Sequence, residues 1–196
     1  LAKFVNDQLS RWPLACENFR ALKNVHVREL SVGGLTVRVQ HNPARIISSA
    51  ARTDAASLNV RPCFLCRDNR PKEQMRIGFD GRKGKKYDIL VNPYPIFPDH
   101  LVIALACHSP QSIWKRYVDI LDLARAYPDH IFFYNGPKCG ASAPDHHHFQ
   151  GTGRGQMPLE IDVDRLLDDI SGRMPDRSGT YEGFAAELEY LSSVQD

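Results

Sequence analysis

Apolar residues recur along the chain at helical spacing in three stretches. The clearest stretch covers residues 112–127 and ends at Pro128. Weaker helical patterns cover 4–23, with an interruption at Pro13, and 161–170. The apolar positions of the clearest stretch fall on one face of a helix: Ile113, Tyr117, Ile120, Leu121 and Ala124. The pattern therefore predicts few helices.

Strand patterns are more numerous than helical ones. Residues 25–30 and 35–40 flank Gly33-Gly34, which predicts a hairpin. The runs 87–92 and 101–106 are strongly apolar and indicate buried strands. Shorter strands are predicted at 46–49, 131–134 and 145–150. Together these elements predict an α+β fold with a mainly antiparallel sheet flanked by a few helices.

Length and charge describe an ordinary globular chain. The 196 residues suggest a single domain over 1–196, with a core at about 25–150 and a C-terminal helical extension at 151–196. A formal net charge of +2 is too small to predict a nucleic-acid or membrane surface. No apolar run approaches the roughly 18 residues of a membrane helix. The basic run 80–86 is interpreted as a solvated loop in preference to a phosphate site.

The cysteines indicate the compartment and a metal site. There are five, with one tight pair, Cys63 and Cys66, and this pattern favours a reducing cytoplasm over a secreted disulfide framework. The Cys-x-x-Cys spacing is typical of half a tetrahedral zinc site. A redox pair and two buried cysteines are the alternatives. A zinc site needs two more ligands, for which His108 and His146 are available.

Residues 135–150 hold the densest group of reactive side chains. If 145–150 is extended, alternate side chains share a face, and that face carries His146, His148 and Gln150. The preceding loop offers backbone N–H groups for an anion, from Gly136, Gly140, Ala141 and Ser142. Lys138 can add a point charge. This arrangement indicates a phosphoryl-transfer site, with metal binding or a surface histidine cluster as the alternative.

Residues 135–150 resemble the active-site segment of the galactose-1-phosphate uridylyltransferase branch of the histidine-triad superfamily. Their His-x-His-x-Gln motif is 146–150. The Gly-Pro-Lys-x-Gly-Ala-Ser run is similar to diadenosine tetraphosphate phosphorylases, and the His-x-His-Phe-Gln ending to GDP-galactose phosphorylases. The pair Cys63–Cys66, followed by His108, is similar to the uridylyltransferase zinc site. The resemblance runs from about His41 to Gln150.

The resemblance implies a histidine-triad-like fold, a homodimer and a role for each matching residue. His148 would be the nucleophile that carries a covalent nucleotidyl group, and Gln150 would bind phosphoryl oxygens. A structural zinc ion would be held by Cys63, Cys66, His108 and His146. The phosphate pocket would be lined by Asn135, Gly140 and Ser142, and further phosphate contacts would come from Arg45 and Arg52.

Gln150 narrows the reaction class. An amide cannot act as a general acid, so the leaving group must be stable as an anion. We therefore expect a nucleotidyltransferase or phosphorylase that acts on a nucleoside diphosphate-hexose or a dinucleoside polyphosphate, with phosphate or a sugar phosphate as acceptor. A nucleotide hydrolase on the same scaffold, and a non-catalytic zinc- and nucleotide-binding module, are the alternatives.

Overall fold

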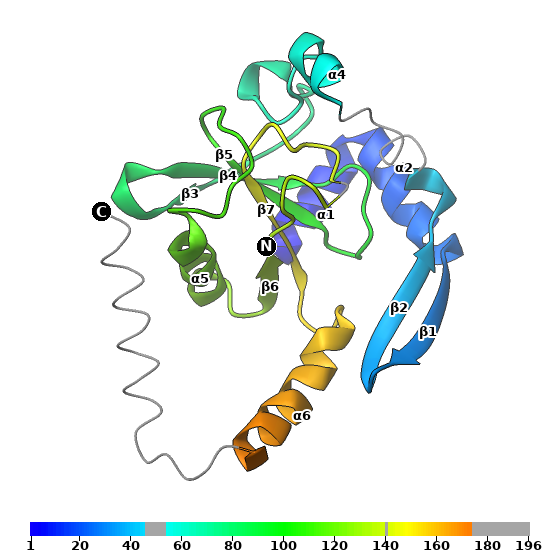
Figure 1. Cartoon of the computed structure of the whole chain (residues 1–196). Coiled ribbons are helices and arrows are strands. Elements are labelled where there is room, and N and C mark those ends of the chain that lie inside the picture. Colours follow the sequence, from blue (N-terminus) through cyan, green and yellow to red (C-terminus); the bar gives the residue numbers. More distant parts are fainter. Residues whose placement is uncertain (46–53, 140, 174–196) are drawn as a thin grey trace.

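The computed structural model describes residues 1–45, 54–139 and 141–173. In these residues the fold is α+β, with a five-stranded antiparallel sheet, a separate two-stranded hairpin and a few flanking helices (Figure 1). The central sheet has the strand order β3-β4-β5-β7-β6. Its strands are β3 (Ile77–Asp80), β4 (Lys86–Val91), β5 (Leu101–Leu105), β6 (His130–Phe133) and β7 (His148–Gly153). The predicted fold class is confirmed.

The central strands β4 and β5 are apolar, apart from Lys86 at the exposed start of β4 and the buried Asp88, because both faces of the sheet are buried. One face packs against α1 (Ala2–Arg11) and α5 (Tyr117–Ala126), and its core includes Tyr87, Ile89, Val91, Leu101, Ile103, Leu105 and Phe149. The other face is smaller and packs against a loop that carries the cysteine pair, through Leu90, Val102 and Ala104. This second face is the one that builds the site.

The N-terminal helices are attached to the sheet through α1, which packs on its first face and bonds the segment before β3. Helix α1 ends before Trp12, which is extended (φ −126°, ψ 94°) as expected for a residue before proline, and α2 (Pro13–Ala21) follows. Gln8 of α1 bonds the Glu73 carbonyl (2.9 Å) and accepts from the Met75 N–H (2.6 Å). The predicted interruption at Pro13 is confirmed.

The hairpin of β1 (His26–Val32) and β2 (Leu35–His41) stands apart from the central sheet (Figure 1). Its turn needs positive φ at both central residues, which Gly33 (59°) and Gly34 (78°) supply. Helix α6 (Pro158–Arg173) lies beside β2, and Asp162 accepts from the Thr36 N–H at 2.7 Å. The hairpin prediction is confirmed, whereas the strand predicted at 46–49 lies outside the described residues.

Two predicted boundaries differ from the structure, and one short helix was not predicted. Helix α5 begins five residues later than expected because Lys115 has a φ of 61°, which no helix accommodates. Strand β7 begins at His148 instead of residue 145, since the chain turns at 144–146. The unpredicted helix is α4 (Ala55–Val60), which is capped by the Asp54 carboxylate at the Ser57 N–H (2.9 Å).

The basic turn at 80–86 is neutralised by carboxylates. Its ion pairs are Lys86–Asp80 (2.7 Å), Arg82–Asp122 (2.7 Å) and Lys85–Asp119 (3.2 Å). These pairs fit a structural turn better than a phosphate site. In the part of the chain that the structure describes, no helix is long and apolar enough to cross a membrane.

Candidate active site and metal centre

Four side chains from three separate segments meet at one point. Cys63, Cys66, His108 and His146 place one ligand atom each within 4.8 Å of one another. The Cys63 sulfur lies 3.3 Å from Nδ1 of His146, and the Cys66 sulfur lies 3.2 Å from Nδ1 of His108. This group can hold a metal ion, and its two sulfurs and two imidazoles are a donor set typical of tetrahedral zinc.

The protonation states around His146 fit a metal ligand. Its Nε2 lies 2.8 Å from the Leu105 carbonyl, which can only accept, so Nε2 carries the proton and Nδ1 is available to a metal. Burial lowers the pKa of His146, which keeps the ring neutral. Burial raises the pKa of the Cys63 thiol to about 11, so ligation displaces a proton there at neutral pH.

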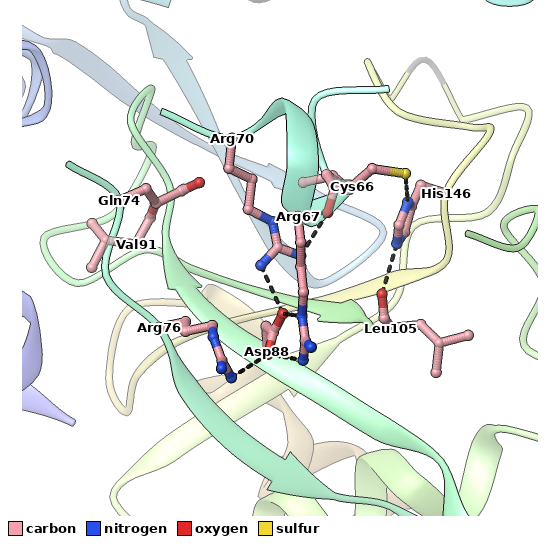
Figure 2. A network of polar contacts seen from close by, with 10 residues as sticks. Cys66, Arg67, Arg70, Gln74, Arg76, Asp88, Val91, Leu105 and His146 are labelled. Atoms are coloured by element: carbon pink, nitrogen blue, oxygen red, sulfur yellow. Dashed lines mark hydrogen bonds and ion pairs between the residues drawn. The ribbon is translucent and has the colours of Figure 1, made fainter. Parts of the chain in front are cut away.

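An ion-pair network attaches the cysteine loop to the sheet (Figure 2). Asp88 of β4 is fully buried and accepts from Arg67 (2.8 and 2.9 Å), Arg70 (2.7 Å) and Arg76 (3.1 Å). Arg70 also donates to the Leu65 carbonyl, between the two cysteines (2.9 and 2.6 Å). Burial raises the pKa of Asp88, but hydrogen bonds from the arginines outweigh it and hold that pKa below its usual value.

His148 begins β7 and faces the second side of the sheet, opposite Ala104. Its Nδ1 lies 2.9 Å from the His146 carbonyl, so Nδ1 carries the proton and Nε2 keeps its lone pair. Burial lowers the pKa of His148, and the ring is therefore neutral near pH 7. A neutral imidazole with a fixed tautomer and an unprotonated Nε2 is a competent nucleophile.

Gln150 is oriented by a second buried histidine, His100. The Ile96 N–H donates to Nδ1 of His100 (3.2 Å), so Nε2 carries the proton and donates to the Gln150 Oε1 (2.7 Å). Burial lowers the pKa of His100 to about 4, which keeps this arrangement at neutral pH. The Gln150 amide N–H groups are then the donors it presents to a ligand.

A cavity of about 610 Å³ lies over this face of the sheet. It brings together five of the predicted site residues: Arg45, Asn135, Ser142, His148 and Gln150. Its apolar lining includes Trp12, Leu14, Phe64, Leu65, Leu90 and Val102. Among the described residues, no aspartate or glutamate lines it. The cavity therefore suits an anionic ligand that also carries an apolar group.

The basic residues and Gly140 that were predicted to contact phosphate lie in different settings. Burial lowers the pKa of the Arg45 guanidinium, and its buried Nε has no hydrogen-bond partner among the described residues, so it can bind an anion. Lys138 is exposed and does not line the cavity. Arg52 and Gly140 lie outside the described residues.

Successive side chains along 147–149 point to opposite faces of the sheet, which places His148 at the site and its two neighbours in the core. His147 and Phe149 point to the opposite face, where their rings meet edge to face at 4.8 Å. Burial lowers the pKa of His147 to about 3, so this histidine is neutral and belongs to the core. Of the three consecutive histidines, His146 faces the metal group and His148 the cavity.

Two residues that hold the loops of the site were not identified by the sequence analysis. Arg61 bonds the Asp145 carboxylate (2.8 Å) and the Ser142 carbonyl (3.0 Å), which ties the cysteine loop to the histidine loop. Gln111 is buried and bonds the backbone of His148. Neither belongs to a spaced motif, and both act across long sequence separations, so no local signal identifies them.

The model of one protein family matches residues 4–153, which includes the whole site. The chain belongs to this family, described as "Domain of unknown function (DUF4922)". No curated protein matches the chain.

Two similar solved structures are of yeast Ap4A phosphorylase Apa2. The complex with AMP is 18% identical with a TM-score of 0.46, over 76% of this chain and 50% of that one. The complex with Ap4A is 19% identical with a TM-score of 0.41, over 77% and 54%. The DUF4922 chain thus spans about half the length of these phosphorylase chains.

Proposed function

We propose that this chain is a nucleotidyltransferase or phosphorylase of the histidine-triad superfamily that works through a covalent nucleotidyl-His148 intermediate. The observation that carries the proposal is the tautomer of His148, whose Nδ1–H is held by the His146 carbonyl, which leaves Nε2 unprotonated on a residue that lines the cavity. Arg45, Asn135, Ser142 and the Gln150 amide surround the same cavity and suit a phosphate chain. The apolar lining suits a nucleoside.

The chemistry takes place in two balanced displacements. Nε2 of His148 attacks the α-phosphorus of a nucleoside diphosphate-hexose or a dinucleoside polyphosphate, and the bond to the bridging oxygen breaks. The leaving phosphate departs as an anion, which needs no general acid, and Gln150 has no proton to give. An oxygen of phosphate or of a sugar phosphate then attacks the same phosphorus. The P–N bond breaks and the neutral imidazole is restored.

We propose a structural role for zinc at the four-residue metal group. Cys63, Cys66, His108 and His146 would fill a tetrahedral shell, which leaves no position for substrate. The ion would fix the loop whose His146 carbonyl orients the nucleophile. From the chain length we extend the proposal to one domain over 1–196, and on the resemblance to a homodimer. The cysteine pattern supports a reducing, cytoplasmic setting.

A product assay distinguishes this function from its alternatives. The protein is incubated with GDP-, UDP- and ADP-hexoses and with diadenosine tetraphosphate, each without acceptor, with inorganic phosphate and with a sugar 1-phosphate, and the nucleotides are separated by chromatography. We expect nucleotide release from one donor that depends on phosphate or a sugar phosphate. Release that is equally fast without any acceptor would identify a hydrolase. Binding of a donor without release would identify a binding module.

A further inference from the structure

The segment 108–111 lies alongside the residues that lead into β7. Its first residue is His108, whose Nδ1 lies 3.2 Å from the Cys66 sulfur in the metal group. The segment then runs antiparallel to 144–147. The His147 N–H donates to the Ser109 carbonyl (2.6 Å), and the Gln111 N–H donates to the Pro144 carbonyl (3.2 Å). One short stretch of chain therefore connects the metal group to the start of the catalytic strand.

The side chain of Gln111 completes this connection. It is only 4% exposed, and three hydrogen bonds satisfy it. Its Oε1 accepts from the His148 N–H (2.9 Å). Its Nε2 donates to the carbonyls of His148 (3.0 Å) and Asn135 (2.8 Å). A single amide thus fixes the backbone on both sides of the His148 Cα and also the backbone of Asn135, which lines the cavity.

The geometry points to Gln111 as a positioning residue for the His148 nucleophile, an inference that rests on the proposed function. His148 is the first residue of β7, where the regular ladder begins, and the chain turns just before it. Without Gln111 the peptide units around His148 lose two hydrogen bonds, and the Asn135 carbonyl loses a third. A displacement of about 1 Å at a reacting atom can cost about 10²-fold in rate. Gln111 does not line the cavity, and among the described residues its side chain bonds only backbone atoms, not the ring of His148.

Gln8 supplies a matched control for a purely structural role. It is also a buried glutamine that accepts from one backbone N–H and donates to one carbonyl, but it joins α1 to residues 73–75. Gln8→Leu and Gln111→Leu therefore remove the same kind of contact. Gln111→Glu is the conservative variant, since it keeps an oxygen for the His148 N–H and loses the donor.

The test measures the first-order rate of nucleotidyl-enzyme formation at saturating donor, by rapid quench and intact mass. We expect Gln111→Leu to slow this rate by about 10- to 100-fold, with full final stoichiometry, unchanged metal content and little change in the donor concentration at half-maximal rate. The rate of nucleotidyl-enzyme formation in Gln111→Glu should lie between the rates in Gln111→Leu and in the unmodified protein. Gln8→Leu should lower the melting temperature without slowing the reaction.

Hydrogen exchange gives a readout that does not depend on activity. The His148 amide should lose protection in Gln111→Leu and keep it in Gln8→Leu. An adduct that forms equally fast in Gln111→Leu and in the unmodified protein overturns the positioning inference alone. If the unmodified protein forms no adduct with any donor, the proposed function fails and the inference falls with it.

Discussion

Asp88→Ala is expected to lower the free energy of unfolding by about 3–5 kcal/mol. The carboxylate is fully buried and neutralises three arginines, one of which, Arg70, has a side chain only 6% exposed. Its removal leaves that guanidinium buried without a counter-charge, and releases the loop between Cys63 and Cys66. Urea denaturation followed by circular dichroism measures the change.

Asp80→Ala is the matched control for this prediction. Asp80 also forms an ion pair, with Lys86 at 2.7 Å, but its side chain is 77% exposed. Exposed pairs contribute about 0–1 kcal/mol, so this variant should unfold almost like the unmodified protein. If Asp88→Ala loses no more stability than Asp80→Ala, the network does not anchor the metal loop.

Lowering the pH should remove part of the stability that the Asp88 carboxylate contributes to the unmodified protein. The folded pKa of Asp88 lies below its usual value, so the carboxylate contributes stability that is complete above the unfolded pKa of about 3.9. That contribution is lost as the pH falls through the folded pKa. The stability gap between the unmodified protein and Asp88→Ala should therefore narrow in that acidic range.

The second large effect is expected on metal removal. The protein as purified should contain about one zinc ion per chain, because two thiols and two imidazoles converge within 4.8 Å. A strong chelator should lower the melting temperature by more than about 10 °C, since each kcal/mol shifts it by about 2–4 °C in a chain of this size and a structural site contributes several kcal/mol. Elemental analysis measures the zinc content, and differential scanning calorimetry measures the melting temperature with and without the chelator.

Cysteine variants check which residues hold the ion. Cys66→Ser should lose the zinc, whereas Cys107→Ser should retain it, because Cys107 is exposed and does not belong to the four-residue group. Zinc retained in Cys66→Ser, or stability unaffected by the chelator, would contradict the assignment.

Local patterns predicted the elements of this fold well and their ends less well. Alternation placed His148 and Gln150 on one face and Phe149 on the other, because strand geometry depends only on adjacent residues. The late start of α5 depends on the left-handed backbone of Lys115, which no spacing pattern encodes. Similarly, the turn that delays β7 is fixed by contacts with a distant segment.

Motifs indicated which side chains to consider for the candidate site, whereas residues held by tertiary pairing left no signal in the sequence. The cysteine pair is visible as a motif, but its approach to His146 requires β5 to pair with β7. Asp88 lies among apolar residues of its strand, and its role depends on arginines from another loop, which the strand pattern does not indicate. Lys138 was predicted as a phosphate contact from its place in a glycine-rich loop; it is exposed and does not line the cavity, and the contact stays a prediction.

The intact mass of the protein after incubation with each donor, without acceptor, tests the central claim most directly. His148→Asn is the variant, and His26→Asn, at an exposed position of the hairpin, is the matched control. We predict a gain of one nucleoside monophosphate in the unmodified protein and in His26→Asn, and none in His148→Asn. A modification retained in His148→Asn, or no adduct with any donor in zinc-containing protein, would contradict covalent catalysis by His148.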